Sequence, residues 1–289
     1  MAERGGVEGA STARGWALAG PALGWTGVFF LAPMALVLAY SLFRRVGGQL
    51  DTTLSLENYR RALTEEVFRT ALVNSLEVTL VTVVISVVVA YPVAYLLAYR
   101  LPRRRGQVLL ALAVLPFWTS YVVRSYSWLL VLAKEGVVNR TLLELGLVSS
   151  PITIANTRAA TIIGFVHFFT MLVTLTIYAS LVQIPESYRK AAHDLGASGL
   201  RTLLHVTLPL SMPGVIVGAF LTFVLAIGDY ITPQILGGAS ELLLPQAIML
   251  QVQRAGDFPM AATLSMVLLV VIALAYLSSA RRFSLGAPR

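Results

Sequence analysis

Long runs of apolar residues, separated by shorter polar segments, make up most of this sequence. A helix that crosses a hydrocarbon core about 30 Å thick needs about 20 mostly apolar residues, because no water is present there to bind its backbone groups. Six runs meet this requirement, and we predict that each forms a membrane-spanning helix, called a span below. The six predicted spans cover residues 25–42, 71–99, 107–123, 159–181, 214–236 and 260–280.

Some residues inside or beside these runs disrupt a regular helix. Pro33 predicts a kink in the first span. Pro116 and Arg124 predict that the third span bends or ends early. Asp229 and Pro233 interrupt the fifth run, with Asp229 in its middle, so this span is expected to be broken.

A signal peptide is the alternative interpretation of the first run. Residues 15–43 carry no charge. This length exceeds the roughly 7–15 apolar residues of a signal peptide. We therefore predict a span.

The composition also favours a membrane protein. Of the 289 residues, 57% are hydrophobic and 12% are charged, and the mean hydropathy is +0.76. Soluble domains carry about twice this share of charge. The net charge of +8 is typical of nucleic-acid binding only when the basic residues share one soluble face. Here they lie in the gaps between the apolar runs, which predicts contact with membrane lipid and none with nucleic acid.

An arginine-rich link at 100–105 sets the expected orientation. Basic residues in short loops remain on the cytoplasmic side, so this link, both termini and the loop between the fourth and fifth spans are predicted to be cytoplasmic. The predicted organisation is a cytoplasmic tail at 1–24, a first span with an extracytoplasmic loop at 25–70, a five-helix core at 71–280 that includes a loop at 184–212, and a cytoplasmic tail at 281–289.

The loop between the fourth and fifth spans predicts two short helices. Pro185 suits the first helical position and Glu186 complements the helix dipole, while Gly196 can adopt the left-handed conformation at the helix end. Ser198 can cap a second helix that Pro209 is expected to stop. An amphipathic helix of this kind either docks in a groove of a partner protein or rests on lipid.

The sequence of this loop, KAAHDLGASGLRTLLHVTLPL, resembles the loop signature of permeases of ABC importers. The matching positions are Ala191, Ala192, Gly196, Val206, Leu208 and Pro209. The family's Glu is replaced by Lys190, so a salt bridge from that Glu to an ATPase is not carried over.

The resemblance implies an all-α integral membrane protein with six transmembrane helices, of the type I ABC importer permease architecture, in a bacterial inner membrane. It implies import, and it implies that the loop forms a cytoplasmic coupling helix. The implied partners are two ABC ATPases, a second homologous permease and an extracytoplasmic substrate-binding protein. The residues implied for contact with the ATPase are Glu186, Lys190, Ala191, Ala192, Leu195, Gly196, Leu208 and Pro209.

Two further stretches resemble the permeases of spermidine/putrescine systems, namely residues 115–128 (LPFWTSYVVRSYSW) and 228–238 (GDYITPQILGG). This resemblance implies a polyamine cargo. Permeases for ferric iron, phosphonates, opines or amino-acid-like cargo share much of the same pattern and remain alternatives, as does a secondary transporter without an ATPase.

Ionisable and aromatic residues inside the spans are candidates for the substrate path. Asp229 is the first candidate and Glu77 the second, because a carboxylate inside a span usually faces a cavity or a partner. Aromatic faces attract alkylammonium groups, although the same residues also form the aromatic belt at membrane surfaces. The aromatic candidates are Trp118, Tyr121, Tyr126, Trp128 and Tyr230.

The sequence offers no catalytic chemistry. His167, His193 and His205 lack the spacing of metal ligands, and the chain has no cysteine. Neither Lys134 nor Lys190 follows a glycine, which excludes a phosphate-binding loop. We therefore predict a transport subunit without an enzyme site, metal or cofactor.

Overall fold

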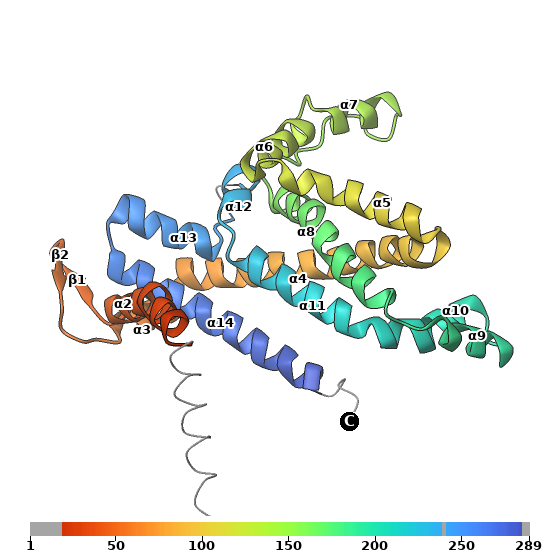
Figure 1. Cartoon of the computed structure of the whole chain (residues 1–289). Helices are drawn as coiled ribbons and strands as arrows, with labels where there is room; N and C mark the ends of the chain where they lie inside the picture. Colours follow the sequence, from red (N-terminus) through yellow and green to blue (C-terminus); the bar gives the residue numbers. More distant parts are fainter. Residues whose placement is uncertain (1–18, 239–240, 285–289) are drawn as a thin grey trace, which may run out of the picture. The chain divides into compact units, whose positions relative to one another are not determined.

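The computed structural model describes residues 19–238 and 241–284 (Figure 1). The described chain forms two compact units. The first comprises residues 19–64 and 248–267, and the second comprises residues 65–238, 241–247 and 268–284.

Five helical segments within the described residues are long and apolar enough to cross a membrane. They agree with the first, second, fourth, fifth and sixth predicted spans. Their bounds are Ala19–Ser41, Glu66–Arg100, Arg158–Leu181, Gly199–Ile227 and Phe258–Ser279.

The third predicted span is broken rather than continuous. It is divided among α5 (Arg103–Val114), the 3-10 turn η3 (Leu115–Trp118) and α6 (Tyr121–Leu132). The break falls at the expected place, because Pro116 has no backbone N–H to donate. Of the six predicted spans, five correspond to continuous helical segments in the described chain, and the third is a broken segment.

The core of the second unit consists of three long helices: α4 (Glu66–Tyr95), α8 (Arg158–Leu181) and α11 (Leu208–Ile227). Small residues let α8 and α11 approach closely. A Cβ atom added to Gly218 lies 2.3 Å from Thr176 Oγ1, and one added to Gly214 lies 2.5 Å from Ser180 Cβ. This close approach of helices through small residues is typical of membrane proteins.

The remaining elements of the second unit are short. They are the π-helical turns η2 (Leu96–Arg100) and η4 (Leu203–Thr207) and the helices α7 (Val137–Glu144), α9 (Glu186–Asp194), α10 (Gly199–Thr202), α12 (Ile231–Leu236) and α13 (Leu244–Leu250). Figure 1 shows α9 and α10 at one end of the pair formed by α8 and α11.

The expectation that Pro209 stops a helix is wrong. The chain remains helical from Gly199 to Ile227, and Pro209 lies at the beginning of α11. The π-helical turn η4 comes immediately before it, and the backbone N–H of Leu208 donates to the carbonyl of Leu203, five residues back. This changed hydrogen-bond register lets the chain accept a residue that lacks a backbone donor.

The first unit contains a β-hairpin that the prediction of an all-α chain missed. Strand β1 (Arg44–Val46) pairs antiparallel with β2 (Gln49–Asp51). Gly47 and Gly48 have φ angles of 59° and 84°, as the two-residue turn of such a hairpin requires. Thr53, through its backbone N–H and its hydroxyl, lowers the pKa of the Asp51 carboxyl.

Helices complete the first unit. They are the π-helical turn η1 (Gly27–Leu31), α2 (Ala32–Ser41), α3 (Glu57–Thr64), the π-helical turn η5 (Gln251–Ala255) and the beginning of α14 (Phe258–Ser284). Pro33 lies at the beginning of α2, directly after η1. The hydroxyl of Thr263 on α14 donates to the carbonyl of Ser41 at 3.0 Å.

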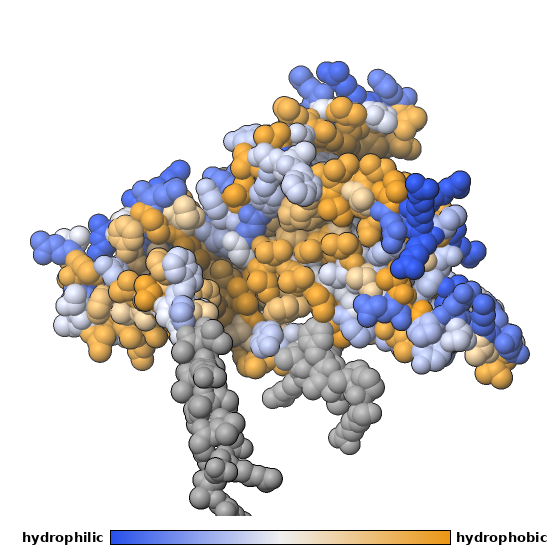
Figure 2. Space-filling model, in the orientation of Figure 1, coloured by the Kyte–Doolittle hydropathy of each residue, from blue (hydrophilic) through white to orange (hydrophobic). Residues whose placement is uncertain are grey.

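On α4 of the second unit, large apolar residues lie outside and mostly small or polar residues lie inside. Val84 and Val88 of α4 are exposed, whereas Thr82 and Ser86 on the same helix are buried. Figure 2 shows hydrophobic residues over the long helices and hydrophilic residues gathered around α7, α9 and α10. A large exposed apolar surface is unfavourable in water, so this arrangement fits helices surrounded by lipid.

Candidate functional site

The candidate coupling helix is α9, and its end is fixed by backbone hydrogen bonds. Pro185 precedes the helix as its N-cap rather than filling the first helical position. At the other end, Gly196 has a φ angle of 82°, which confirms the predicted left-handed conformation. The N–H groups of Gly196 and Ala197 donate to the carbonyls of His193 and Ala192 at 2.8 and 3.0 Å. This is the Schellman arrangement, which closes a helix with a glycine.

The helix after Gly196 begins as predicted. The side chain of Ser198 accepts a hydrogen bond from the backbone N–H of Arg201 at 3.4 Å and caps α10. Leu208 and Pro209 lie at the beginning of α11, and Leu208 is half-buried while Pro209 is exposed. The loop and the fifth span therefore form one continuous helical segment.

The surface of α9 is open to a partner. None of its residues is buried by the rest of the chain, and Leu195, which follows it, is 89% exposed. Ala191 is exposed and Ala192 is half-buried. Single exposed apolar residues are common on protein surfaces, so Leu195 shows that this end of α9 is accessible to another molecule.

The departure at Lys190 has a local consequence. Lys190 Nζ lies 3.4 Å from Glu186 Oε1, one turn earlier on the same exposed helix face. An exposed pair of this kind contributes about 0.3–0.5 kcal/mol at most. Lys190 and Glu186 thus form a weak ion pair within α9, and both side chains remain accessible.

Contacts with Tyr99 connect α9 to the long helices. The Arg189 guanidinium lies 3.9 Å from the centroid of the Tyr99 ring, and the Tyr99 hydroxyl donates to the carbonyl of Leu181 at 2.8 Å. Tyr99 lies at the end of the second span and Leu181 at the end of α8. Tyr99 therefore contacts both α9 and the end of α8 from the end of the second span.

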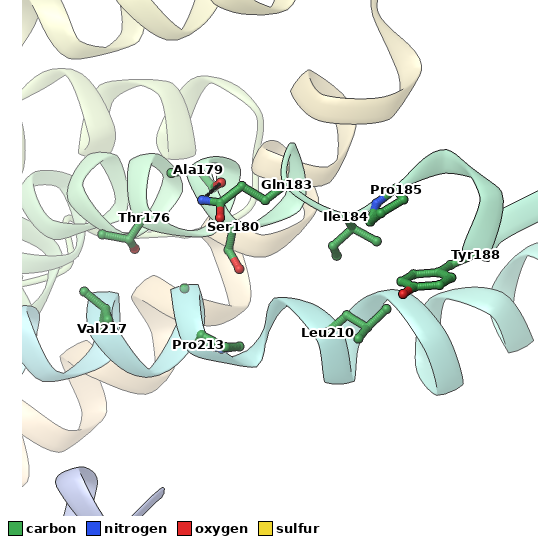
Figure 3. Close-up of a pocket in the computed structure, with 11 residues that line it drawn as sticks. Thr176, Ala179, Ser180, Gln183, Ile184, Pro185, Tyr188, Leu210, Pro213 and Val217 are labelled. Atoms are coloured by element: carbon green, nitrogen blue, oxygen red, sulfur yellow. Dashed lines mark hydrogen bonds between the residues drawn. The ribbon is translucent and has the colours of Figure 1, made fainter. Parts of the chain in front are cut away.

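A groove of about 500 Å³ lies beside this connection (Figure 3). Ile184, Pro185 and Tyr188 line one side, and Leu210 and Pro213 of α11 line the other. The groove is lined by residues of α8, α9 and α11, so it lies where the candidate coupling helix meets the two long helices. No sequence pattern singled out Tyr99, Tyr188 or Arg189, because their contacts depend on the fold.

The first substrate-path candidate, Asp229, lies at a break between two helices. The predicted break in the fifth span falls at this residue, since α11 ends at Ile227 and α12 begins at Ile231. Asp229 Oδ1 accepts a hydrogen bond from the backbone N–H of Ile231, and Oδ2 accepts one from the Thr232 hydroxyl, both at 2.8 Å. Asp229 directly precedes Tyr230, the N-cap residue of α12, and its carboxylate accepts the first backbone N–H of that helix, a local contact that competes with a continuous helix here.

Tyr121, another candidate, contacts Asp229 directly. Its hydroxyl donates to Asp229 Oδ2 and also bonds the Thr232 hydroxyl. Its ring lies 5.0 Å from that of Phe168 on α8. Phe168 is ten residues after Arg158, or about 15 Å along α8, so Tyr121 and Asp229 lie level with the middle of that helix.

The structure adds residues around this pair that sequence reasoning missed. The Phe117 and Phe168 rings lie 4.5 Å apart, and the Arg124 guanidinium lies over both. Thr232 is the further polar member of the group. Aromatic enrichment in residues 115–128 was visible in the sequence, but Phe168 comes from a different helix.

The other predicted path residues lie elsewhere. Trp118 is 87% exposed and Tyr126 is also exposed. Trp128 packs its ring against His167 with 5.3 Å between centroids. Tyr230 is half-buried beside Asp229.

Glu77 belongs to a separate ionic cluster. It pairs with Arg158 at the beginning of α8, and Arg158 Nε also lies 2.7 Å from Glu241 Oε2. Arg158 Nη2 donates to Asn74 Oδ1 at 2.8 Å. Asn74, Arg158 and Glu241 were not predicted. The two carboxylate candidates therefore lie in separate groups, Asp229 with Tyr121 and Glu77 with Arg158.

Helices long and apolar enough to cross a membrane, two of them joined by an exposed, capped helix, define a multi-pass helical membrane protein. The chain belongs to the family described as binding-protein-dependent transport system inner membrane components, whose profile matches residues 90–281. It is a permease subunit of an ABC importer and a multi-pass inner membrane protein.

Sequence similarity to known permeases supports this assignment. The chain is 33% identical over 253 residues to the spermidine/putrescine transport system permease protein PotB of Escherichia coli (strain K12), covering 87% of this chain and 91% of the relative. It is 34% identical over 251 residues to PotB of Haemophilus influenzae, covering 86% and 87%.

Solved structures share the fold. A chain of a bacterial ABC transporter involved in the import of alginate has a TM-score of 0.73 at 17% identity, covering 94% of this chain and 98% of that chain. A chain of the MetNI methionine ABC transporter has a TM-score of 0.58 at 17% identity, covering 78% and 100%.

Proposed function

We propose that this permease imports polyamines of the spermidine and putrescine type. The observation that carries the proposal is the 33% identity to PotB of Escherichia coli across 87% of this chain. The carboxylate of Asp229 beside the aromatic rings of Tyr121 and Phe168 supports it, because alkylammonium cations bind carboxylates and aromatic faces. In this proposal Asp229, Tyr121 and Tyr230 contact the cargo inside the membrane, and Trp118 and Glu77 contact it elsewhere along the path.

The permease acts, in this proposal, as half of a pore. A second homologous permease supplies the other half, an extracytoplasmic binding protein delivers the cargo, and two cytoplasmic ATPase subunits hydrolyse ATP. A bacterial alginate ABC transporter with this fold has been solved in complex with a cargo-bound periplasmic protein, which supports the proposed assembly. The boundaries given above, with a five-helix core at 71–280 and cytoplasmic termini, belong to the same proposal.

The helix α9 is the proposed contact with the ATPase. Its exposed surface, from Glu186 to Gly196, inserts into the ATPase, and the contact of Arg189 with Tyr99 carries its movement to the spans. Leu208 and Pro209 extend the moving segment into α11. ATP and the loaded binding protein drive transport because each binds one state of the permease more tightly than the other.

The experiment that tests the cargo is uptake by cells with and without this gene. Labelled spermidine, putrescine, ferric iron, phosphonate and amino acids are supplied separately, and uptake is measured with and without metabolic energy. The proposal predicts that only energy-dependent polyamine uptake is lost with the gene. Loss of another cargo with polyamine uptake unchanged contradicts the proposed cargo.

A further inference from the structure

A cation already occupies the aromatic group beside Asp229. The carbon at the centre of the Arg124 guanidinium lies 5.1 Å from the centroid of the Phe168 ring and 5.8 Å from that of Phe117. A cation within about 6 Å of an aromatic centroid is attracted by the negative face of the ring. Both rings are half-buried, so they form a partly enclosed aromatic surface that can bind a positive charge.

The same aromatic surface lies close to a carboxylate that can accept a further hydrogen bond. Tyr121 lies one turn before Arg124 on α6, its ring contacts Phe168, and its hydroxyl donates to Asp229. Asp229 Oδ1 accepts one hydrogen bond, from Ile231, within the described part of the chain. A carboxylate oxygen has two lone pairs, so Oδ1 can accept a second N–H donor.

The Arg124 side chain is held by contacts that can be exchanged. Its Nη2 donates to the Thr119 carbonyl at 3.2 Å and to the Thr119 hydroxyl at 3.1 Å, on the turn just before α6. Hydrogen bonds in such partly exposed positions contribute little net stability, because water can replace them. These two hydrogen bonds therefore do little to hold the guanidinium on the rings.

We infer that Phe117, Phe168, Tyr121 and Asp229 form a binding site for a primary ammonium cation, and that Arg124 fills this site when no cargo is present. The identity of the natural cargo rests on the proposed function, but the cation site does not. An incoming ammonium group has to displace Arg124, because two positive charges over the same rings repel each other. Arg124 thus lowers the affinity for cargo and helps its release.

The test is equilibrium binding of labelled spermidine to the assembled complex, with the full chain, in lipid nanodiscs without ATP. Arg124→Gln is expected to bind spermidine about tenfold more tightly than the wild type, since the competing cation is gone. Arg124→Lys keeps the cation and is expected to bind as the wild type does. Adding Phe168→Leu to Arg124→Gln removes one ring and is expected to abolish the gain.

Arg140→Gln is the matched control, because it removes the same charge from α7. Unchanged binding in this variant excludes a general effect of net charge. If Arg124→Gln does not assemble, Arg124→Met gives the same test with a side chain of similar length that packs on the rings. Equal or weaker spermidine binding after neutralisation of Arg124, in a complex that assembles, overturns the inference.

Uptake by the wild type separates this inference from the proposed function. If the wild type imports a different cargo while Arg124→Gln gains spermidine binding, the proposed cargo is wrong and the cation site stands. If the wild type imports polyamines while Arg124→Gln gains nothing, the proposed cargo stands and the cation site is wrong.

Discussion

Gly196 determines how α9 ends and how it meets the next helix. Its φ angle of 82° lies in the left-handed region, which costs a residue with a Cβ atom about 1 kcal/mol or more. No neighbouring atom lies within 4 Å of a Cβ placed there, so the backbone angle alone requires glycine.

Replacing Gly196 by Ala is therefore expected to destabilise the end of α9 by about 1 kcal/mol and to reduce ATP-driven uptake. Gly199→Ala is the control, since Gly199 also has open space at its Cβ position but no left-handed φ angle. Uptake and ATP hydrolysis are measured together in the assembled transporter. Equal activity of the two variants contradicts the role given to Gly196.

Asp229 combines a structural role with the proposed electrostatic one, and two variants separate them. Asp229→Asn keeps an oxygen for the N–H of Ile231 but loses the charge, and we expect polyamine uptake to fall about tenfold or more, because a hydrogen bond to a charged group contributes about 1.5–3 kcal/mol. Thr232→Val removes a hydroxyl that donates to Asp229 and keeps the charge, so its effect is expected to be smaller. Unchanged uptake by Asp229→Asn across spermidine concentrations removes this carboxylate from the path.

The sequence predicted residues whose role is local better than residues that act through distant contacts. Gly196 and Ser198 follow rules that involve only their neighbours in the chain, and the structure confirms both. Arg124 was interpreted only as the end of a span, because its contact with Phe168 joins residues 44 positions apart. Glu77 was recognised, but its partner Arg158 was not, for the same reason.

At the scale of elements, the packing of α8 against α11 depends on two glycines. A Cβ atom on Gly218 lies 2.3 Å from Thr176 Oγ1 and 3.3 Å from Val173 atoms. Gly218→Ala is expected to reduce the free energy of unfolding by about 1–3 kcal/mol, because the helices must separate. The measurement is thermal unfolding of the purified protein.

A second substitution supplies the check on this packing. Thr176→Ala removes the atom that the new methyl group meets first, so the double variant Gly218→Ala/Thr176→Ala is expected to recover part of the loss. Strictly additive effects of the two substitutions are inconsistent with direct contact between these positions.

The link between α9 and the spans makes a separate prediction. Tyr99→Phe keeps the ring under Arg189 and loses the hydrogen bond to Leu181, whereas Tyr99→Leu loses both contacts. We expect a graded loss of coupling, with more ATP hydrolysed per polyamine imported in Tyr99→Leu than in Tyr99→Phe. Wild-type coupling in Tyr99→Leu rules out Tyr99 as the link.

The length and apolar character of a run predicted the membrane spans well, but irregular elements were harder to predict. Pro116 correctly indicated a broken third segment, whereas Pro209 was wrongly taken as a helix end because the π-helical turn before it was not foreseen. The hairpin at Arg44–Asp51 was missed since its strands have three residues each, and only Gly47 and Gly48 marked it.

At the scale of the whole molecule, the sequence predicts the class of protein better than it predicts the path of the cargo through the protein. Apolar runs and the loop at 184–212 indicated an importer permease, and the family match confirms that class. The path depends on side chains from several helices, and in the proposed assembly a second permease contributes as well. One chain therefore cannot specify the whole path through its own sequence pattern.

The most direct test of the account is spermidine uptake by the purified complex reconstituted in liposomes with its binding protein. The account predicts uptake when ATP is present on the side that carries α9, and none when an ion gradient replaces ATP. Uptake driven by an ion gradient without the ATPase subunits would contradict it and would identify a secondary transporter.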